Sequence, residues 1–133
     1  MTTRQAQAML AAAEDRAAAI GVPVNIALLD AGAHLKAFVR MDGAVLGSID
    51  VAMKKARTAV LFNCASDAVW EYCKPGAPAH GLEISNGGLA PFAGGILVKG
   101  REGETVGAIG VSGGAVAQDL DIAQAAVAAF NPR

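Results

Sequence analysis

The stretch VNIALLDAGAHLKAFVRM, residues 24–41, decides the predicted fold. Its first six residues, 24–29, are mostly β-branched or aliphatic, which is typical of a buried strand. The next four, Asp30 to Ala33, include an Asp and a Gly, two residues that favour a tight turn. From residue 34 to residue 41 apolar and polar side chains alternate, which predicts a second strand. Two strands joined by so short a turn form a β-hairpin, so we expect an antiparallel sheet.

Helical patterns lie on both sides of this hairpin. Apolar residues recur at three- and four-residue spacing near both ends of the chain. A third such segment follows the hairpin, where Ser48 is the expected N-cap and Asp50 and Lys54 are spaced to form an i,i+4 ion pair. A fourth, shorter piece precedes a Pro-Gly break. The predicted helices are 3–19, 48–62, 66–72 and 118–130.

The second half of the chain predicts another pair of strands. Residues 91–99 and 104–112 read as strands joined by a tight turn around Gly100 to Gly103. Residues 81–88 are either irregular or one further short strand. Hairpins with helices packed on them indicate one α+β domain over residues 1–133, rather than a parallel sheet built from β-α-β units.

Composition excludes several classes of protein. The 133 residues are 53% hydrophobic with a net charge of −1, which argues against disorder. Only six residues are aromatic and there is no basic excess, which argues against a nucleic-acid partner. No apolar run approaches the roughly 20 residues that cross a membrane, and no secretory signal pattern begins the sequence. We therefore expect a cytoplasmic protein in which Cys64 and Cys73 stay reduced.

Three cationic residues form one candidate binding group. Arg40 ends the second predicted strand, and Lys54 and Arg57 lie one turn apart on the helix that follows. If that helix packs near the end of the strand, the three side chains can hold a carboxylate or phosphate. The alternative, which the spacing favours, is a solvated face on which Asp50 neutralises Lys54.

A glycine-rich stretch, GAIGVSGG at 107–114, is the second candidate. Glycines such as Gly110 in a strand permit close approach of a backbone or a flat ligand. Ser112 and Gly113, just before a helix, can present backbone N–H groups to an anion. The equally favoured alternative is a bulged strand that turns into a helix. The glycine pairs at 87–88 and 94–95 form either a cleft wall or, preferably, a packing contact.

The spacing of the histidines and cysteines does not indicate a metal site or a catalytic thiol. His34 and His80 are the only histidines, and no metal-binding spacing occurs. His34 lies where a turn meets a strand, which is typical of an exposed or hydrogen-bonded residue but also suits a single axial haem ligand. Neither cysteine has a base nearby in sequence, so a catalytic thiol is disfavoured.

Several of these segments, in order, resemble the GlcG/HbpS-like family of small haem-binding or "haem-degrading" domains, which also occurs at the C-terminus of PduO-type corrinoid adenosyltransferases. The segments are VNIALLDAGAHL from Val24, RMDG from Arg40, AMKKARTA from Ala52, GGILV from Gly94, GAIGVSGG from Gly107, and Gln118-Asp119. The resemblance covers about residues 5–130. Two departures stand out: Ala33 replaces the second glycine of the family's Asp-x-Gly-Gly-His turn, and the family's Gly-Gly-x-Pro is stretched to GGLAP at 87–91.

The resemblance implies a profilin-like fold with a five-stranded antiparallel sheet. It also implies homo-oligomers, often octamers, and association with haem or another tetrapyrrole in some members. Other members accompany catabolic operons.

Three functions of different classes stay open. In the first, the protein binds haem or a related flat anion, whose carboxylates Arg40 and Lys54 hold. In the second, it is a catabolic enzyme that orients a carboxylate substrate and uses His34 or Asp30 as base. In the third, it is an oligomeric accessory protein without a ligand. The residues expected at the binding site are His34, Arg40, Lys54, Arg57, Gly110, Ser112 and Gly113.

Overall fold

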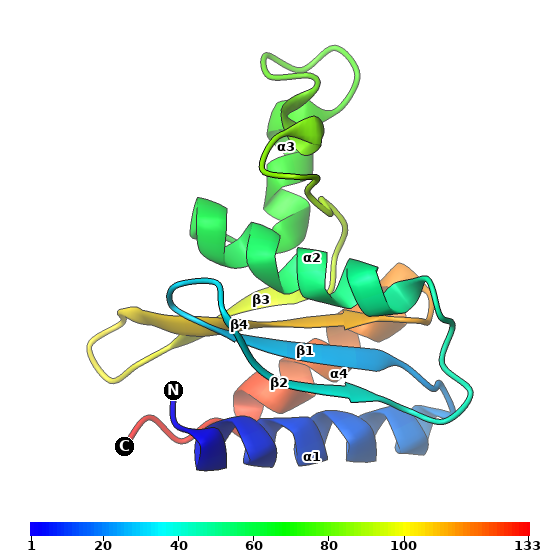
Figure 1. Cartoon of the computed structure of the whole chain (residues 1–133), viewed down its shortest axis with the longest axis vertical. Coiled ribbons are helices and arrows are strands. Elements are labelled where there is room, and N and C mark those ends of the chain that lie inside the picture. Colours follow the sequence, from blue (N-terminus) through cyan, green and yellow to red (C-terminus); the bar gives the residue numbers. More distant parts are fainter.

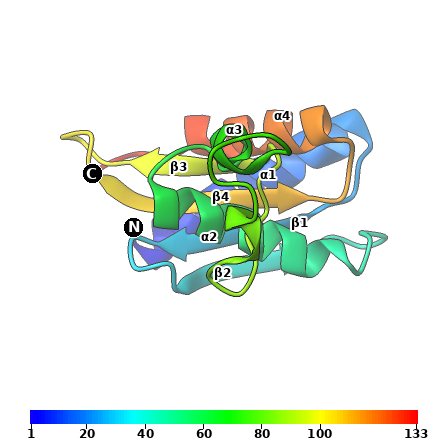
Figure 2. The same cartoon turned by 90° about the horizontal axis from the view of Figure 1, so that it is seen from above.

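In the computed structural model, which describes all residues 1–133, one antiparallel sheet lies between two layers of helix (Figure 1). Its four strands follow the order β2-β1-β4-β3. Helices α1 and α4 cover one face and α2 covers the other, as the view from above also shows (Figure 2). The elements are α1 (Thr3–Ile20), β1 (Asn25–Asp30), β2 (Leu35–Arg40), α2 (Ser48–Phe62), α3 (Trp70–Cys73), β3 (Gly95–Lys99), β4 (Thr105–Ser112) and α4 (Val116–Ala128), with short 3-10 turns at Ser66–Val69 and Leu82–Ile84.

The predicted α+β, profilin-like class is confirmed, but the sheet has four strands, not five. Residues 81–88 do not pair with the sheet because their backbone bonds are local: Ile84 donates to Gly81 and Gly88 donates to Ser85. Strand β3 begins at Gly95, later than predicted, because the backbone at Gly94 is left-handed, with φ of 125°. The Ser48 N-cap is also wrong. Gly47 occupies the cap position of α2 and makes no side-chain bond.

The two faces of the sheet are packed differently. Large aliphatic side chains, among them Met9, Leu28 and Ile109, fill the space between the sheet and α1 and α4. The α2 face instead packs the small residues Ala56, Ala59 and Ala108 around Leu29. A Cβ added at Gly110 would overlap the backbone carbonyl of Ala52, so glycine lets α2 lie directly on β4.

A buried ion pair joins α2 to the start of α4. Lys55 Nζ lies 3.0 Å from Asp119 Oδ2 and donates to the Val111 carbonyl at 2.9 Å. The other oxygen of Asp119 accepts the Gly114 N–H at 2.9 Å. A Cβ at Gly94 would lie 2.9 Å from Lys55 Nζ, too close for a side chain there. The preferred packing interpretation of the 94–95 pair is therefore confirmed.

The segment between α2 and β3, residues 63–94, rises from the sheet as an arm (Figure 1). Its own small core contains Val69, Cys73 and Leu89. Trp70, Tyr72 and Phe92 are exposed on its outside, half of the aromatic residues of the chain. None of the helices in the fold is both long and apolar enough to cross a membrane.

Candidate functional site

A small hollow of about 180 Å³ opens where the β1–β2 hairpin meets α2, and we call it the hairpin hollow. It forms because α2 packs mainly on β4, β1 and β3 and leaves the edge strand β2 largely uncovered. The register pairs Leu35 of β2 with Leu29 of β1, so both side chains point toward the α2 side. The hollow is lined by Leu29, Ala33, Leu35, Asp50, Met53, Lys54 and Arg57.

Two of the three predicted cations reach this hollow. Lys54 Nζ lies 3.1 Å from Asp50 Oδ2, which confirms the predicted i,i+4 pair, and the same side chain lies against Gly88 of the arm. Arg57 donates through Nη1 to the carbonyl of Asn86, also in the arm. Asp50 therefore offsets part of the charge, but the Arg57 guanidinium faces no carboxylate and keeps further donors for a ligand.

Arg40 lies apart from this pair. It is exposed and sits opposite Asn25, at the other end of β2 from Leu35. At 3.3 Å per residue those two ends are about 17 Å apart. The three cations thus do not form one clamp: Lys54 and Arg57 share the hollow and Arg40 does not line it.

His34 follows Ala33 in the β1–β2 turn and is not itself one of the residues that line the hollow. Its side chain is 81% exposed, and Nδ1 lies 3.5 Å from Asp30 Oδ1. The same carboxylate oxygen accepts the backbone N–H of His34 at 3.0 Å and that of Gly32 at 2.9 Å. The bond from the His34 backbone is the main cause that lowers the pKa of Asp30 below its usual value of 3.8. The ionised Asp30 therefore holds the turn and faces one ring nitrogen, while the other ring nitrogen has no protein partner.

Comparison with known proteins assigns the chain to a family. A family model described as "Haem degrading protein HbpS-like" matches residues 1–128. The chain belongs to the HbpS-like family. It is 41% identical over 120 residues to the corrinoid adenosyltransferase PduO of Salmonella typhimurium, a match that covers 90% of this chain but 36% of PduO. The chain thus spans about a third of the length of the PduO relatives that it matches.

Solved structures agree with the fold. The Klebsiella pneumoniae protein ORFY superposes with a TM-score of 0.94 at 35% identity, covering 98% of this chain and 90% of that one. A PduOC:heme complex superposes with a TM-score of 0.92 at 38% identity, covering 98% of this chain and 95% of that one. The resemblance seen in the sequence is therefore confirmed at the level of family and fold.

In this HbpS-like domain the glycine-rich candidates lie away from the hairpin hollow. Gly110 is covered by the backbone of α2, which leaves no space there for a flat ligand. Ser112 is buried opposite Asn25, and Gly113, with φ of 144°, packs against Pro23 and Val24. Strand β4 ends at Ser112 and α4 begins at Val116, so this stretch is a strand that turns into a helix, as the alternative interpretation predicts.

Asn25 is a polar residue whose position the sequence pattern did not single out. It is fully buried, donates through Nδ2 to the Val45 carbonyl at 3.0 Å, and leaves Oδ1 without a partner. The sequence feature that could have identified Asn25 is a single amide side chain inside the apolar run VNIALL. Its contact ties β1 to the loop before α2 and so positions the helix that carries Lys54 and Arg57.

The cysteines are not arranged for catalysis. Both are free, and burial raises the pKa of the Cys64 and Cys73 thiols above the usual 9.0. Each thiol therefore stays protonated at neutral pH and is a weak nucleophile. The fold brings together no group of three His, Cys, Asp or Glu side chains suited to a metal ion.

Proposed function

We propose that this protein binds haem, or a closely related flat anionic tetrapyrrole, at the hairpin hollow, as an accessory to a catabolic or redox pathway. The observation that carries the proposal is a hollow with apolar and cationic side chains beside the β1–β2 turn, which also presents the exposed ring of His34. Membership of the HbpS-like family and the similarity to a haem complex of PduOC support it.

The residues of the hollow suit the separate parts of such a ligand. Leu29, Leu35 and Met53 offer apolar contact, and Lys54 and Arg57 suit its carboxylates. His34 is the imidazole available as an axial ligand, and haem bound there would supply iron redox chemistry. A hollow of about 180 Å³ is smaller than the roughly 300–1,000 Å³ of pockets that enclose a ligand. The ring would therefore enter by one edge and remain partly at the surface or against a second subunit.

Titration with hemin tests the proposal. The wild-type protein is expected to give a saturable change in the Soret band at low micromolar concentration, and His34→Ala to lose it. His80→Ala is the matched control, because His80 is the only other histidine and its ring bonds the Cys73 carbonyl in the arm. No saturable change in the wild type, or loss in His80→Ala with retention in His34→Ala, would overturn the proposal.

The cations provide a second test of the site. Lys54→Ala and Arg57→Ala should each weaken hemin binding roughly three- to tenfold, because each removes a charge-assisted contact. Arg40→Ala should leave affinity unchanged, since Arg40 lies outside the hollow. Circular dichroism checks that Arg57→Ala is folded, because this change also removes the bond to Asn86. Equal weakening by Arg40→Ala would instead place the ligand along the whole of β2.

The pair formed by Asp30 and His34 favours one second candidate, an enzyme that acts on a carboxylate substrate. Asp30 stays ionised and faces the imidazole, which is the arrangement of a base held by a carboxylate. Lys54 and Arg57 would orient the substrate. This candidate predicts that wild-type protein binds small carboxylates but shows no saturable Soret change. A protein that binds neither ligand would instead be an accessory protein.

We also infer that the protein is a cytoplasmic homo-oligomer, up to an octamer. The exposed aromatic side chains Trp70, Tyr72 and Phe92 on the arm support an association surface, because such residues are enriched at interfaces. Light scattering during size-exclusion chromatography measures the subunit count. A monomeric wild-type protein at micromolar concentration would contradict this inference.

A further inference from the structure

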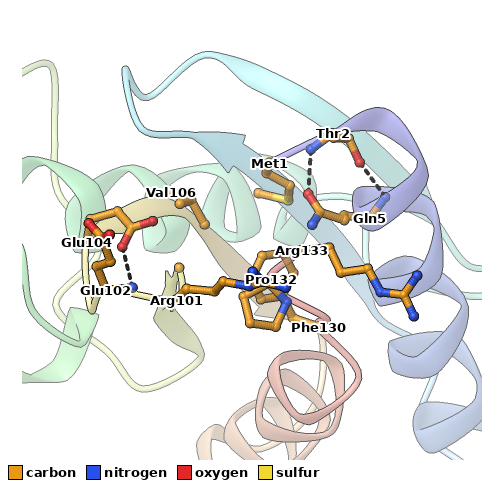
Figure 3. A pocket seen from close by; sticks show the side chains of 11 residues that line it. Met1, Thr2, Gln5, Arg101, Glu102, Glu104, Val106, Phe130, Pro132 and Arg133 are labelled. Atoms are coloured by element: carbon orange, nitrogen blue, oxygen red, sulfur yellow. Dashed lines mark hydrogen bonds between the residues drawn. The ribbon is translucent and has the colours of Figure 1, made fainter.

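A second, larger hollow lies where the two ends of the chain meet the β3–β4 turn, and we call it the terminal hollow (Figure 3). It has a volume of about 440 Å³ and adjoins another of about 320 Å³, with which it shares Thr2, Gln5 and Arg133. Its apolar residues Met1, Val106 and Phe130 pack on the core that α1 and α4 cover, so it lies on the opposite side of the sheet from the hairpin hollow.

Most of the Lys and Arg side chains without a polar contact lie around these two hollows. Of the 11 Lys and Arg side chains, only Arg4, Lys36, Arg40, Arg101 and Arg133 make neither an ion pair nor a hydrogen bond. Three of these five line the terminal hollow or its neighbour: Arg4, Arg101 and Arg133. In Figure 3 the Arg133 side chain extends toward α1, on the far side of the hollow from Arg101. Free guanidinium groups on two sides of a hollow suit a ligand with more than one negative group.

The acidic residues of the terminal hollow do not neutralise these arginines. Glu104 turns back over its own loop, where Oε2 accepts the Glu102 N–H at 2.9 Å and the carboxylate covers Gly100. In Figure 3 Glu102 and Glu104 lie on one side, while the Arg101 side chain extends away from them toward Pro132. Neither glutamate forms an ion pair with Arg101 or Arg133.

The other residues of the wall are partly apolar and partly polar. Val106 and Phe130 are half-buried against the main core, and Pro132 lies beside them. Gln5 is held on both sides, since it accepts the Thr2 N–H at 2.8 Å and donates to the Asn131 carbonyl at 2.8 Å. These bonds tie the start of α1 to the end of the chain and preform the hollow.

We propose that the terminal hollow binds a small organic anion that carries two carboxylate or phosphate groups on an apolar body. Arg101 and Arg133 would take the charged groups, and the Val106–Phe130 wall the apolar body. The hollow contains no histidine or cysteine, so it offers no imidazole or thiolate to a haem iron. The proposal is independent of the haem function that we propose for the other side of the sheet.

Titration with phthalate, a benzene ring with two adjacent carboxylates, tests this site by calorimetry or by NMR shifts. We expect saturable one-site binding near millimolar affinity or better, and at least about a tenfold weakening in Arg101→Gln and in Arg133→Gln. Arg40→Gln is the matched control, because Arg40 is equally free but lies at the end of β2. The neutral diamide of phthalate should bind at least about tenfold more weakly than phthalate.

Three results would overturn the proposal. The first is no saturable binding of phthalate to the wild-type protein at about 10 mM. The second is equal weakening in Arg40→Gln, which would indicate general attraction to charge. The third is binding of inorganic pyrophosphate as tight as that of phthalate, which would show that the apolar wall does not contribute to ligand recognition. A hemin titration of Arg101→Gln should match the wild type, so failure of the haem proposal and failure of this one are distinguishable.

Discussion

The two faces of the sheet contrast in what fills them. Under α1 and α4 the sheet buries large aliphatic side chains such as Leu28 and Ile109. Under α2 it buries alanines, glycine Gly110 and the Lys55–Asp119 ion pair. The first face stabilises the fold through apolar area. The second lets α2 lie directly on β4. The position of α2 then places its side chains Lys54 and Arg57 at the hairpin hollow.

The ion pair is the most sensitive point of the α2 face. Lys55→Ala leaves the Asp119 carboxylate buried without its partner, and we expect it to lower the free energy of unfolding by about 3–5 kcal/mol. Urea unfolding followed by circular dichroism measures the loss. Arg16→Ala breaks the exposed pair with Asp121 and should cost less than about 1 kcal/mol. Equal losses in the two variants would mean that burial of the pair is unimportant.

The aliphatic face should respond through cavity formation. Leu28 is fully buried between the sheet and α1 and α4, so Leu28→Ala is expected to cost about 2–5 kcal/mol in the same unfolding experiment. Because this face carries no residue of the hairpin hollow, hemin affinity of the folded variant should stay at the wild-type value. A change in affinity without unfolding would show that the two faces are coupled.

The close approach of α2 gives a smaller expected effect. Gly110→Ala places a methyl group against the Ala52 carbonyl and should cost about 1–3 kcal/mol, because the helix must move off β4. Gly47→Ala is the control, since an added Cβ there meets nothing within 4 Å. If Gly110→Ala is as stable as Gly47→Ala, α2 adjusts its position freely, and the contrast between the faces is weaker than we describe.

Acid should lower the stability of the fold through Asp30 in the β1–β2 turn, and we expect this to be the smallest of these effects. The pKa of Asp30 is lowered in the folded protein, chiefly by the bond from the His34 backbone. A lowered pKa stabilises the fold above the unfolded value near 3.8, and this stabilisation disappears as the pH falls through the folded value. Between pH 6 and pH 3 the wild type should therefore lose more stability than Asp30→Asn. Equal losses of stability in the wild type and in Asp30→Asn would show that the pKa of Asp30 is the same in the folded and unfolded states.

Much of the fold could be predicted because its signals are local. The alternation over residues 34–41 and the turn at Asp30 to Ala33 gave the first hairpin, and the spacing of Asp50 and Lys54 gave an ion pair that the structure contains. The five strands implied by the resemblance are four, and of the two alternatives left open for residues 81–88 the irregular one is correct, because the backbone there makes local bonds. The sequence could not decide this because glycine-rich segments are compatible with both strands and turns. The Ser48 cap was wrong because the cap position falls one residue earlier, at Gly47.

The sequence by itself determined the hairpins and the main helices, since each depends on residue order and spacing within one short segment, and the family, which depends on several such segments in order. Only the tertiary structure decided which candidates meet. It placed Lys54 and Arg57 together and Arg40 about 17 Å along β2. It also showed that Gly110 accommodates a helix backbone, and it brought Arg101 and Arg133 to one hollow. These outcomes depend on how α2 crosses the sheet and where the chain ends pack, and contacts between distant segments leave no periodic signal in the sequence.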